Sequence, residues 1–149
     1  MIRIKTIPLS EEHWTTQWIP ISYSKILSNY KIKESLSFIW SIDTELKAIC
    51  RAYYINDNII EIGDVWLNDK YRGKKIDGEK ISIIFMKRVI KKIWKHYTNV
   101  KIINLIVDEN NISAIKLYES LNFTFNKKLN NNKLGVKNAI SMSLIKPIS

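Results

Sequence analysis

The sequence has little cysteine, proline or glycine: one Cys, three Pro and four Gly among 149 residues. The lone Cys50 cannot form an internal disulfide, which excludes a disulfide scaffold and favours a reducing, intracellular setting. No window reaches the roughly 18–20 apolar residues of a membrane span, and the N-terminus "MIRIKTIPLS" lacks the features of a signal peptide. Because no Pro- or Gly-rich linker and no internal repeat are present, we expect one cytoplasmic domain covering residues 1–149, with no membrane association.

Positive charge is in excess, since 24 Lys and Arg residues against 14 Asp and Glu residues give a formal net charge of +10. This excess favours an anionic partner, either a phosphorylated cofactor or a nucleic acid. The basic residues are scattered, and neither a basic tail nor a recognition-helix motif is present, which argues against a nucleic-acid-binding module. His13, His96 and Cys50 do not have the spacing of metal ligands, so we expect no metal.

Hydrophobic periodicity predicts an α/β (α+β) fold, with a mixed, mostly antiparallel sheet of six to seven strands and four flanking helices. The expected strands cover residues 2–7, 35–42, 46–55, 59–67, 101–107, 123–126 and 139–145. The expected helices are two short ones within 11–30, separated at Pro20, a long amphipathic one from Ile81, and one capped by Asn110 or Asn111. The unit 59–107 then predicts a βαβ crossover.

Finer features of these elements also follow from the sequence. The segment 101–107 is apolar enough for a strand that is buried on both faces. The last helix has one predicted buried stripe, made of Ala114, Leu117, Tyr118 and Leu121. Asn122 follows this helix at a position that often adopts the left-handed conformation. Gly63, inside a strand, predicts a β-bulge or a close backbone approach, with a packing accommodation as the alternative.

The segment "YRGKKIDGEK" (residues 71–80) joins an apolar strand to the amphipathic helix. A glycine-containing turn before a helix presents backbone N–H groups and the positive end of the helix dipole, which suits a pyrophosphate. A solvated loop explains the same residues equally well. The segment lacks the Gly-Lys-Ser/Thr ending of a P-loop and the three spaced glycines of a dinucleotide fingerprint, which excludes both.

Two motifs of the chain resemble those of GNAT superfamily N-acetyltransferases. "VWLNDKYRGKKIDGEKI" is similar to the family's cofactor motif, in which Arg/Gln-x-x-Gly-x-Gly/Ala opens a helix. "NISAIKLYESLNF" is similar to its second motif, Asn-x-x-Ala-x-x-Leu-Tyr-x-x-x-Gly-Phe. The matching positions of the second motif are Asn111, Ala114, Leu117, Tyr118 and Phe123.

The cofactor motif departs from the family pattern at two positions. Counted from Arg72, the pattern requires glycine at 75 and glycine or alanine at 77, where this chain has Lys75 and Asp77. Either the turn is shifted by one residue to use Gly78, or the Asp77 carboxylate lies where the backbone approaches a phosphate.

The resemblance implies a single-domain GNAT fold and direct transfer of an acetyl group from acetyl-CoA, as co-substrate, to a primary amine of a protein or small molecule. It implies that contacts to acetyl-CoA come from Val65, Trp66, Leu67, Arg72, Gly73, Lys74, Lys75, Ile76, Asp77, Gly78 and Asn111. The backbone N–H groups around 65–67 would stabilise the tetrahedral oxyanion.

The same resemblance implies two catalytic side chains. Tyr118 would protonate the departing CoA thiolate, with packing in the core as the alternative role. Glu61 would accept the proton of the attacking ammonium, and Asp64 and Glu109 are the alternatives for this base.

Two other functional interpretations remain open at this point. Lys75 and Asp77 favour a catalytically silent acyl-CoA-binding or regulatory domain on the same fold, and a basic nucleic-acid-binding module is the weaker alternative. A homodimer is compatible with the sequence.

Overall fold

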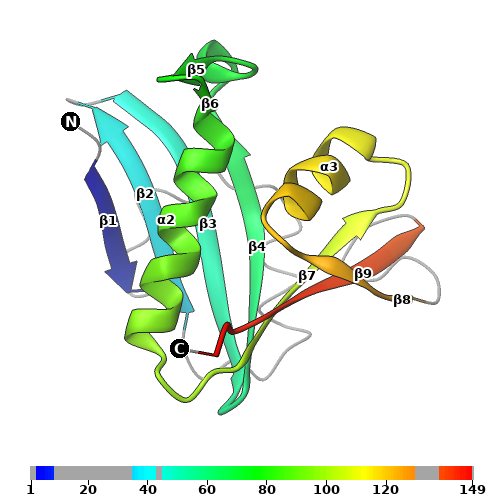
Figure 1. Cartoon of the computed structure of the whole chain (residues 1–149). Helices are drawn as coiled ribbons and strands as arrows, with labels where there is room; N and C mark the ends of the chain where they lie inside the picture. The colour runs from blue at the N-terminus through cyan, green and yellow to red at the C-terminus, as the bar shows by residue number, and fades with distance from the viewer. Residues whose placement is uncertain (1–2, 9–34, 43–44, 130–137, 149) are drawn as a thin grey trace.

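The computed structural model describes residues 3–8, 35–42, 45–129 and 138–148 (Figure 1). The strands are β1 (Arg3–Pro8), β2 (Ser35–Ile42), β3 (Glu45–Asn56), β4 (Ile59–Leu67), β5 (Lys75–Ile76), β6 (Glu79–Lys80), β7 (Ile102–Asp108), β8 (Thr124–Lys128) and β9 (Ala139–Ile145). The helices are the 3₁₀-helix η3 (Asp69–Tyr71) and the α-helices α2 (Ile81–His96) and α3 (Ile112–Ser120). The two short helices expected within residues 11–30 lie outside the described residues.

Seven strands form one sheet in the order β1-β2-β3-β4-β7-β9-β8. Strands β1 to β4 form an antiparallel meander, and β8 and β9 form the expected hairpin. Strands β4 and β7 are parallel neighbours joined through α2, which confirms the predicted βαβ unit. The prediction of a mixed, mostly antiparallel sheet is therefore confirmed over the described part of the chain.

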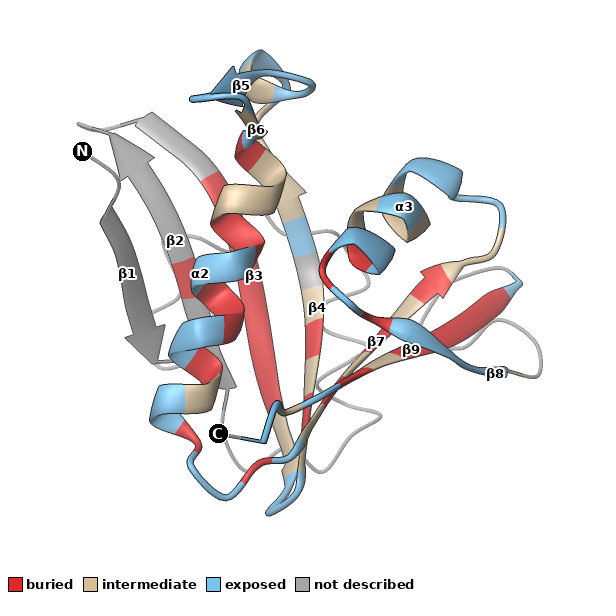
Figure 2. Cartoon of the chain, in the orientation of Figure 1, coloured by how far each residue is buried: buried red, intermediate tan, exposed pale blue. Residues whose placement is uncertain are grey.

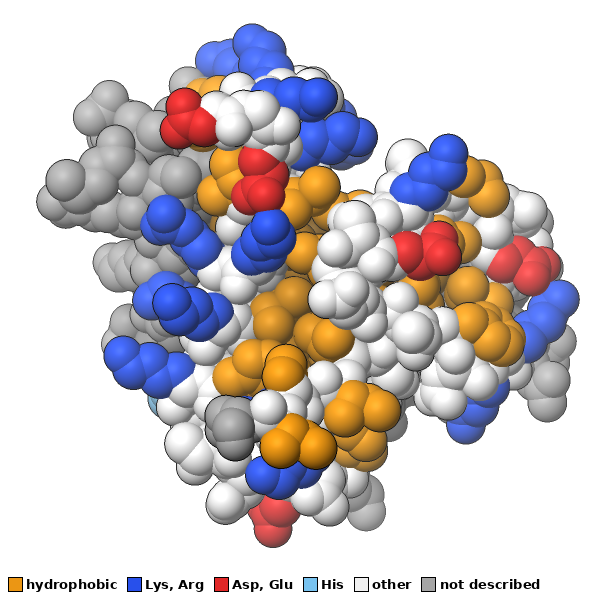
Figure 3. Space-filling model, in the orientation of Figure 1, with side chains coloured by type: hydrophobic (Ala, Val, Ile, Leu, Met, Phe, Trp, Pro, Cys, Tyr) orange, Lys and Arg blue, Asp and Glu red, His pale blue; other side chains and the backbone are white. Residues whose placement is uncertain are grey.

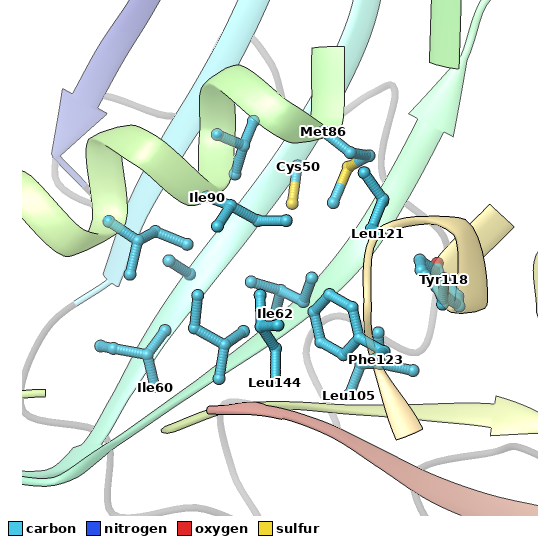
Figure 4. Close-up of a cluster of buried hydrophobic side chains, with 14 of the residues drawn as sticks. Cys50, Ile60, Ile62, Met86, Ile90, Leu105, Tyr118, Leu121, Phe123 and Leu144 are labelled. Atoms are coloured by element: carbon cyan, nitrogen blue, oxygen red, sulfur yellow. The ribbon is translucent and has the colours of Figure 1, made fainter. Parts of the chain in front are cut away.

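Both α-helices cover the same face of this sheet and share one hydrophobic core with it (Figures 2 and 4). Helix α2 buries its Ile81, Phe85, Met86, Val89, Ile90 and Ile93 side chains against the strands. These positions recur every three to four residues, which is why the apolar stripe of the sequence folds as a helix here. The core continues to Tyr118, Leu121 and Phe123 on and after α3.

Helix α3 is flanked by Asn111 and Asn122, and of the two candidate caps Asn110 and Asn111 it is Asn111 that caps it. The Asn111 Oδ1 atom accepts a hydrogen bond from the Ala114 N–H at 3.2 Å and so caps the first turn. Asn122 adopts a positive φ of 73°, and the next N–H, that of Phe123, returns to the Tyr118 carbonyl at 3.0 Å. This ending directs the chain from α3 into β8.

Two finer predictions about burial need correction. Strand β7 is fully buried on one face only: Ile103, Leu105 and Val107 are buried and the residues between them are half-buried. The other face of β7 carries the polar Asn104, which is half-buried. On α3 only the C-terminal part of the predicted stripe is buried, since Ala114 and Leu117 are half-buried.

No helix of the described residues is long and apolar enough to cross a membrane.

Candidate functional site

Strands β4 and β7 separate in the middle of the sheet. Their parallel pairing covers four residues of each strand and ends at Ile62 and Leu105, although β4 continues to Leu67 and β7 to Asp108. The strands diverge beyond that point, and the opening lies between the start of α2 and helix α3 (Figure 1). Figure 3 shows a hollow at this place on the surface, with Lys and Arg side chains on the α2 side.

A β-bulge lies in β4 beside this opening. Arg51 of β3 is paired with Gly63 and Ile49 is paired with Trp66, so Cys50 faces two residues of β4, at positions 64 and 65. The bulge follows Gly63 directly, as the interior glycine predicts. Because the β4–β7 ladder has already ended, the β4 edge from Gly63 to Leu67 has no neighbouring strand on its β7 side among the described residues. This edge borders the opening between β4 and β7.

Tyr118 of α3 lies at the edge of the core next to Leu121 and Phe123 (Figure 4). Its side chain is 8% exposed, and the Phe123 ring packs against it in a T-shape with centroids 5.9 Å apart. Burial raises the pKa of the Tyr118 hydroxyl above its usual value of 10.0, and the charge of an ionised Cys50 would raise it further. The phenol therefore keeps its proton at neutral pH.

The turn that precedes α2 contains a β-hairpin that is not predicted from the sequence. Strands β5 and β6 pair as a two-stranded hairpin with Ile76 opposite Glu79, and Asp77 (φ 52°) and Gly78 (φ 83°) form its two-residue loop. Two successive left-handed residues are the requirement of a type I′ turn, for which Asp-Gly is a preferred sequence. The helix begins only at Ile81. Gly78 is thus a hairpin glycine, and neither it nor Asp77 opens the helix.

The N-terminus of α2 nevertheless keeps the properties of an anion site. Lys80 occupies the cap position without a side-chain hydrogen bond to the helix, and the first turn contains no acidic residue. Lys74, Lys75 and Lys80 are exposed around it. Arg72 is held by Asp69 through an ion pair of 2.6 Å between Nε and Oδ1. The Ile81 N–H donates to the Lys74 carbonyl at 3.0 Å. The other N–H groups of the first turn, together with the nearby cations, suit a phosphate group.

The three candidate bases have different surroundings. Glu61 of β4 is half-buried and is paired in register with Asn104 of β7. Its neighbours Ile60 and Ile62 point into the core under α2, so Glu61 points to the opposite face of the sheet. Glu109 forms an ion pair with Lys128 at 3.4 Å, on the far side of β7 from β4. The side chain of Asp64 lies outside what the structure describes.

Some predicted site residues have structural roles, and one polar pair escaped prediction. Asn111 caps α3 as described above and is exposed. The Ser143 hydroxyl of β9 donates a 2.6 Å hydrogen bond to Asn104 Oδ1 of β7, although 39 residues separate the two in the chain, so only the strand register reveals the pair. Among the described residues no group of three His, Cys, Asp or Glu side chains is arranged to hold a metal ion; His13 lies outside them.

Comparisons with known proteins agree with this arrangement. A sequence model of the acetyltransferase (GNAT) family matches residues 5–123. No curated protein sequence matches the chain. The ribosomal-protein-S18-alanine N-acetyltransferase of Escherichia coli is 20% identical and superposes with a TM-score of 0.68, covering 100% of this chain and 96% of that one.

Two further structures contain ligands. The N-acetyltransferase PseH of Campylobacter jejuni in complex with acetyl coenzyme A is 17% identical, with a TM-score of 0.64 over 99% of this chain and 100% of that one. The spermidine N-acetyltransferase of Vibrio cholerae in complex with CoA and spermine is 14% identical, with a TM-score of 0.69 over 97% and 95% of the two chains. At these identities the likeness establishes a common fold.

Proposed function

The chain belongs to the acetyltransferase (GNAT) family of acetyl-CoA-dependent N-acetyltransferases, and from this premise we propose that residues 1–149 form one domain that transfers the acetyl group to a primary amine. The acceptor amine belongs to a protein or a small molecule. The observation that carries this proposal is the divergence of β4 from β7 beside the bulge after Gly63. That divergence gives a thioester access to the backbone of β4 in the middle of the sheet.

Acetyl-CoA would bind with its pyrophosphate at the N-terminus of α2 and its pantetheine arm in the opening between β4 and β7. The uncapped start of α2 and the exposed Lys74, Lys75 and Lys80 support the first contact. The β4 edge that has no strand neighbour supports the second. The thioester oxygen would then receive hydrogen bonds from N–H groups of residues 65–67, which stabilise the tetrahedral oxyanion.

Two side chains would move the protons of the reaction. Glu61 accepts a proton from the ammonium, directly or through water, and the neutral amine attacks the thioester carbon. The new C–N bond forms, the C–S bond breaks, and the nitrogen releases its second proton. Tyr118 gives its proton to the departing thiolate and recovers one from solvent. The products are an acetamide, free CoA thiol and one proton, so the step is balanced.

A ligand titration tests the binding part of this proposal. Acetyl-CoA at 100 times its dissociation constant stabilises the fold by about 2.7 kcal/mol when it binds only the folded state. We expect a corresponding rise in Tm, and release of CoA thiol when a suitable amine is added. An unchanged Tm at millimolar acetyl-CoA would contradict the function. A raised Tm without thiol release across a broad panel of amines would instead favour a catalytically silent acyl-CoA-binding domain.

A further inference from the structure

We infer that the acceptor carries a hydroxyl group on the carbon next to its amine, and that Asn104 binds this hydroxyl. The inference rests on the proposed function, with Glu61 as the base that faces the amine. The observation behind it is a row of side chains, including Glu61, that lie directly opposite one another on neighbouring strands of the sheet; we call it the polar row.

The row follows from the strand register. Tyr53 of β3 is paired with Glu61 of β4, which is paired with Asn104 of β7. Asn104 is paired with Ser143 of β9, and Ser143 with Thr124 of β8. Residues directly opposite each other on neighbouring strands share a face of the sheet. The flanking residues Ile60, Ile62, Ile103, Leu105, Met142 and Leu144 all point into the core, so the polar row occupies the face opposite α2 and α3.

Exposure changes steadily along this row. Tyr53 is fully buried at one end, Glu61, Asn104 and Ser143 are half-buried, and Thr124 is exposed at the other end. Solvent therefore reaches the three middle side chains, and exposure increases towards β8. An acceptor entering there meets Ser143 and Asn104 before it reaches Glu61 and the divergence of β4 from β7.

The hydrogen bond from Ser143 fixes the orientation of the Asn104 amide. Asn104 Oδ1 accepts from the Ser143 hydroxyl at 2.6 Å, so the amide oxygen faces β9 and the NH₂ group is directed away from it. Within the described residues Ser143 is the hydrogen-bond partner of the Asn104 side chain, which leaves the two N–H donors for a ligand. Glu61 is the register neighbour on the NH₂ side.

This geometry selects an amino alcohol. Neighbouring strands lie about 4.8 Å apart, so hydrogen bonds of about 3 Å from Glu61 and Asn104 converge on two groups carried by adjacent carbons. The carboxylate accepts from the ammonium, and the amide N–H donates to the hydroxyl oxygen. The row contains one carboxylate among its described residues, which matches the single positive charge of an amino alcohol. A plain alkyl amine leaves the half-buried amide donors without an acceptor, which costs affinity.

Matched acceptors test this selection. We would measure kcat/KM for ethanolamine against ethylamine, and for trans-2-aminocyclohexanol against cyclohexylamine, with saturating acetyl-CoA. We expect the hydroxylated member of each pair to be preferred by about tenfold or more, the size of one hydrogen bond to a site built for it. Equal kcat/KM values within both pairs would overturn the inference.

Variants then assign the preference to Asn104. Asn104→Leu should reduce kcat/KM for the amino alcohols to the level of the plain amines while changing the plain amines little. Ser143→Ala should weaken the preference, because the amide is free to rotate. Ser141→Ala is the matched control, since Ser141 lies on the same strand and face and is paired with Ile106 instead of Asn104. A preference that survives Asn104→Leu would contradict the assignment.

The test separates this inference from the proposed function. If plain amines and amino alcohols are acetylated equally, the enzyme stands and the acceptor class is wrong. If no amine is acetylated although acetyl-CoA raises Tm, the catalytic function fails. NMR titration of the CoA-bound protein with the same four amines then decides whether the polar row binds amino alcohols, and equal or absent binding would overturn the inference.

Discussion

A Cβ atom added at Gly63 would lie 3.3 Å from Cε2 of Tyr53, and Tyr53 is fully buried. The absence of a side chain at Gly63 thus allows β4 to approach the Tyr53 ring directly before the bulge. The glycine serves packing as well as the change of register, so the two readings of this residue from sequence are compatible.

Gly63→Ala is therefore expected to lower the free energy of unfolding by about 1–3 kcal/mol, because the added methyl group overpacks a rigid contact. Chemical denaturation measures this loss. The cost should shrink when the same change is made in a Tyr53→Leu background, since the ring that the methyl group meets is gone. Equal costs in both backgrounds would show that the ring is not the limiting contact.

Tyr118→Phe tests the proposed proton donor. Loss of the hydroxyl should reduce kcat by roughly 100-fold, the lower end for a general acid, while the dissociation constant of acetyl-CoA changes little. Tyr97→Phe is the matched control, because Tyr97 is equally buried at 8% exposure but lies at the C-terminal end of α2. A kcat that is unchanged in Tyr118→Phe would leave this tyrosine with a packing role only.

The raised pKa of Tyr118 predicts a pH dependence of stability. In the unfolded chain the phenol ionises near its usual value of 10.0, whereas burial keeps it protonated in the fold to higher pH. Above pH 10 the unfolded state releases a proton that the native state retains, so stability falls with a slope of at most about 1.4 kcal/mol per pH unit. The contribution is fully present below pH 10 and is lost above it.

Comparison of two variants isolates this effect from the other alkaline groups. Between pH 8 and 11 the stability of the wild type should fall more steeply than that of Tyr118→Phe, because the lysines and the remaining tyrosines titrate in both. The two proteins should run parallel between pH 8 and 9. Parallel curves up to pH 11 would mean that Tyr118 ionises in the fold as readily as in the unfolded chain.

Much of the fold could be predicted because its signals are local. Residues 35–42 and 59–67 were predicted as strands with the bounds that the structure gives to β2 and β4. The i, i+4 stripe from Ile81 identified α2, and a cap at Asn110 or Asn111 together with Asn122 marked the two ends of α3. Each of these signals lies within a window of a few residues.

The features that were not predicted depend on contacts distant in sequence or on competing local patterns. The Asp-Gly pair at 77–78 is a strong hairpin signal, but the family's glycine positions predict a turn that opens the helix. The pairing of Asn104 with Ser143 follows from the order β7-β9, which no local pattern contains. The family motifs proposed Tyr118 and Glu61 as catalytic, and their roles stay predictions until the variants are measured.

Ser141 offers a test of polar burial on the sheet face that carries Asn104 and Ser143. Its side chain is 7% exposed, and the hydroxyl has no hydrogen-bond partner among the described residues. Ser141→Ala should therefore raise the free energy of unfolding by about 1 kcal/mol. Ser143→Ala should have the opposite sign, because it leaves Asn104 Oδ1 without its donor. Denaturation of both variants decides this, and a loss of stability in Ser141→Ala would reveal a hydrogen bond to that hydroxyl.

Asp77→Gly tests the position of the hairpin tip relative to the cofactor. Asp77 is exposed and has a φ of 52°, a conformation that glycine adopts readily. Asp77 lies in the hairpin loop and not in the first turn of α2. We therefore expect Asp77→Gly to change the dissociation constant of acetyl-CoA by no more than about twofold, because salt screens an exposed charge. Gly78→Ala, which forces a Cβ atom into a φ of 83°, should instead weaken binding by displacing the hairpin. Calorimetric titration measures both constants, and a tenfold gain in affinity for Asp77→Gly would place its carboxylate beside the pyrophosphate.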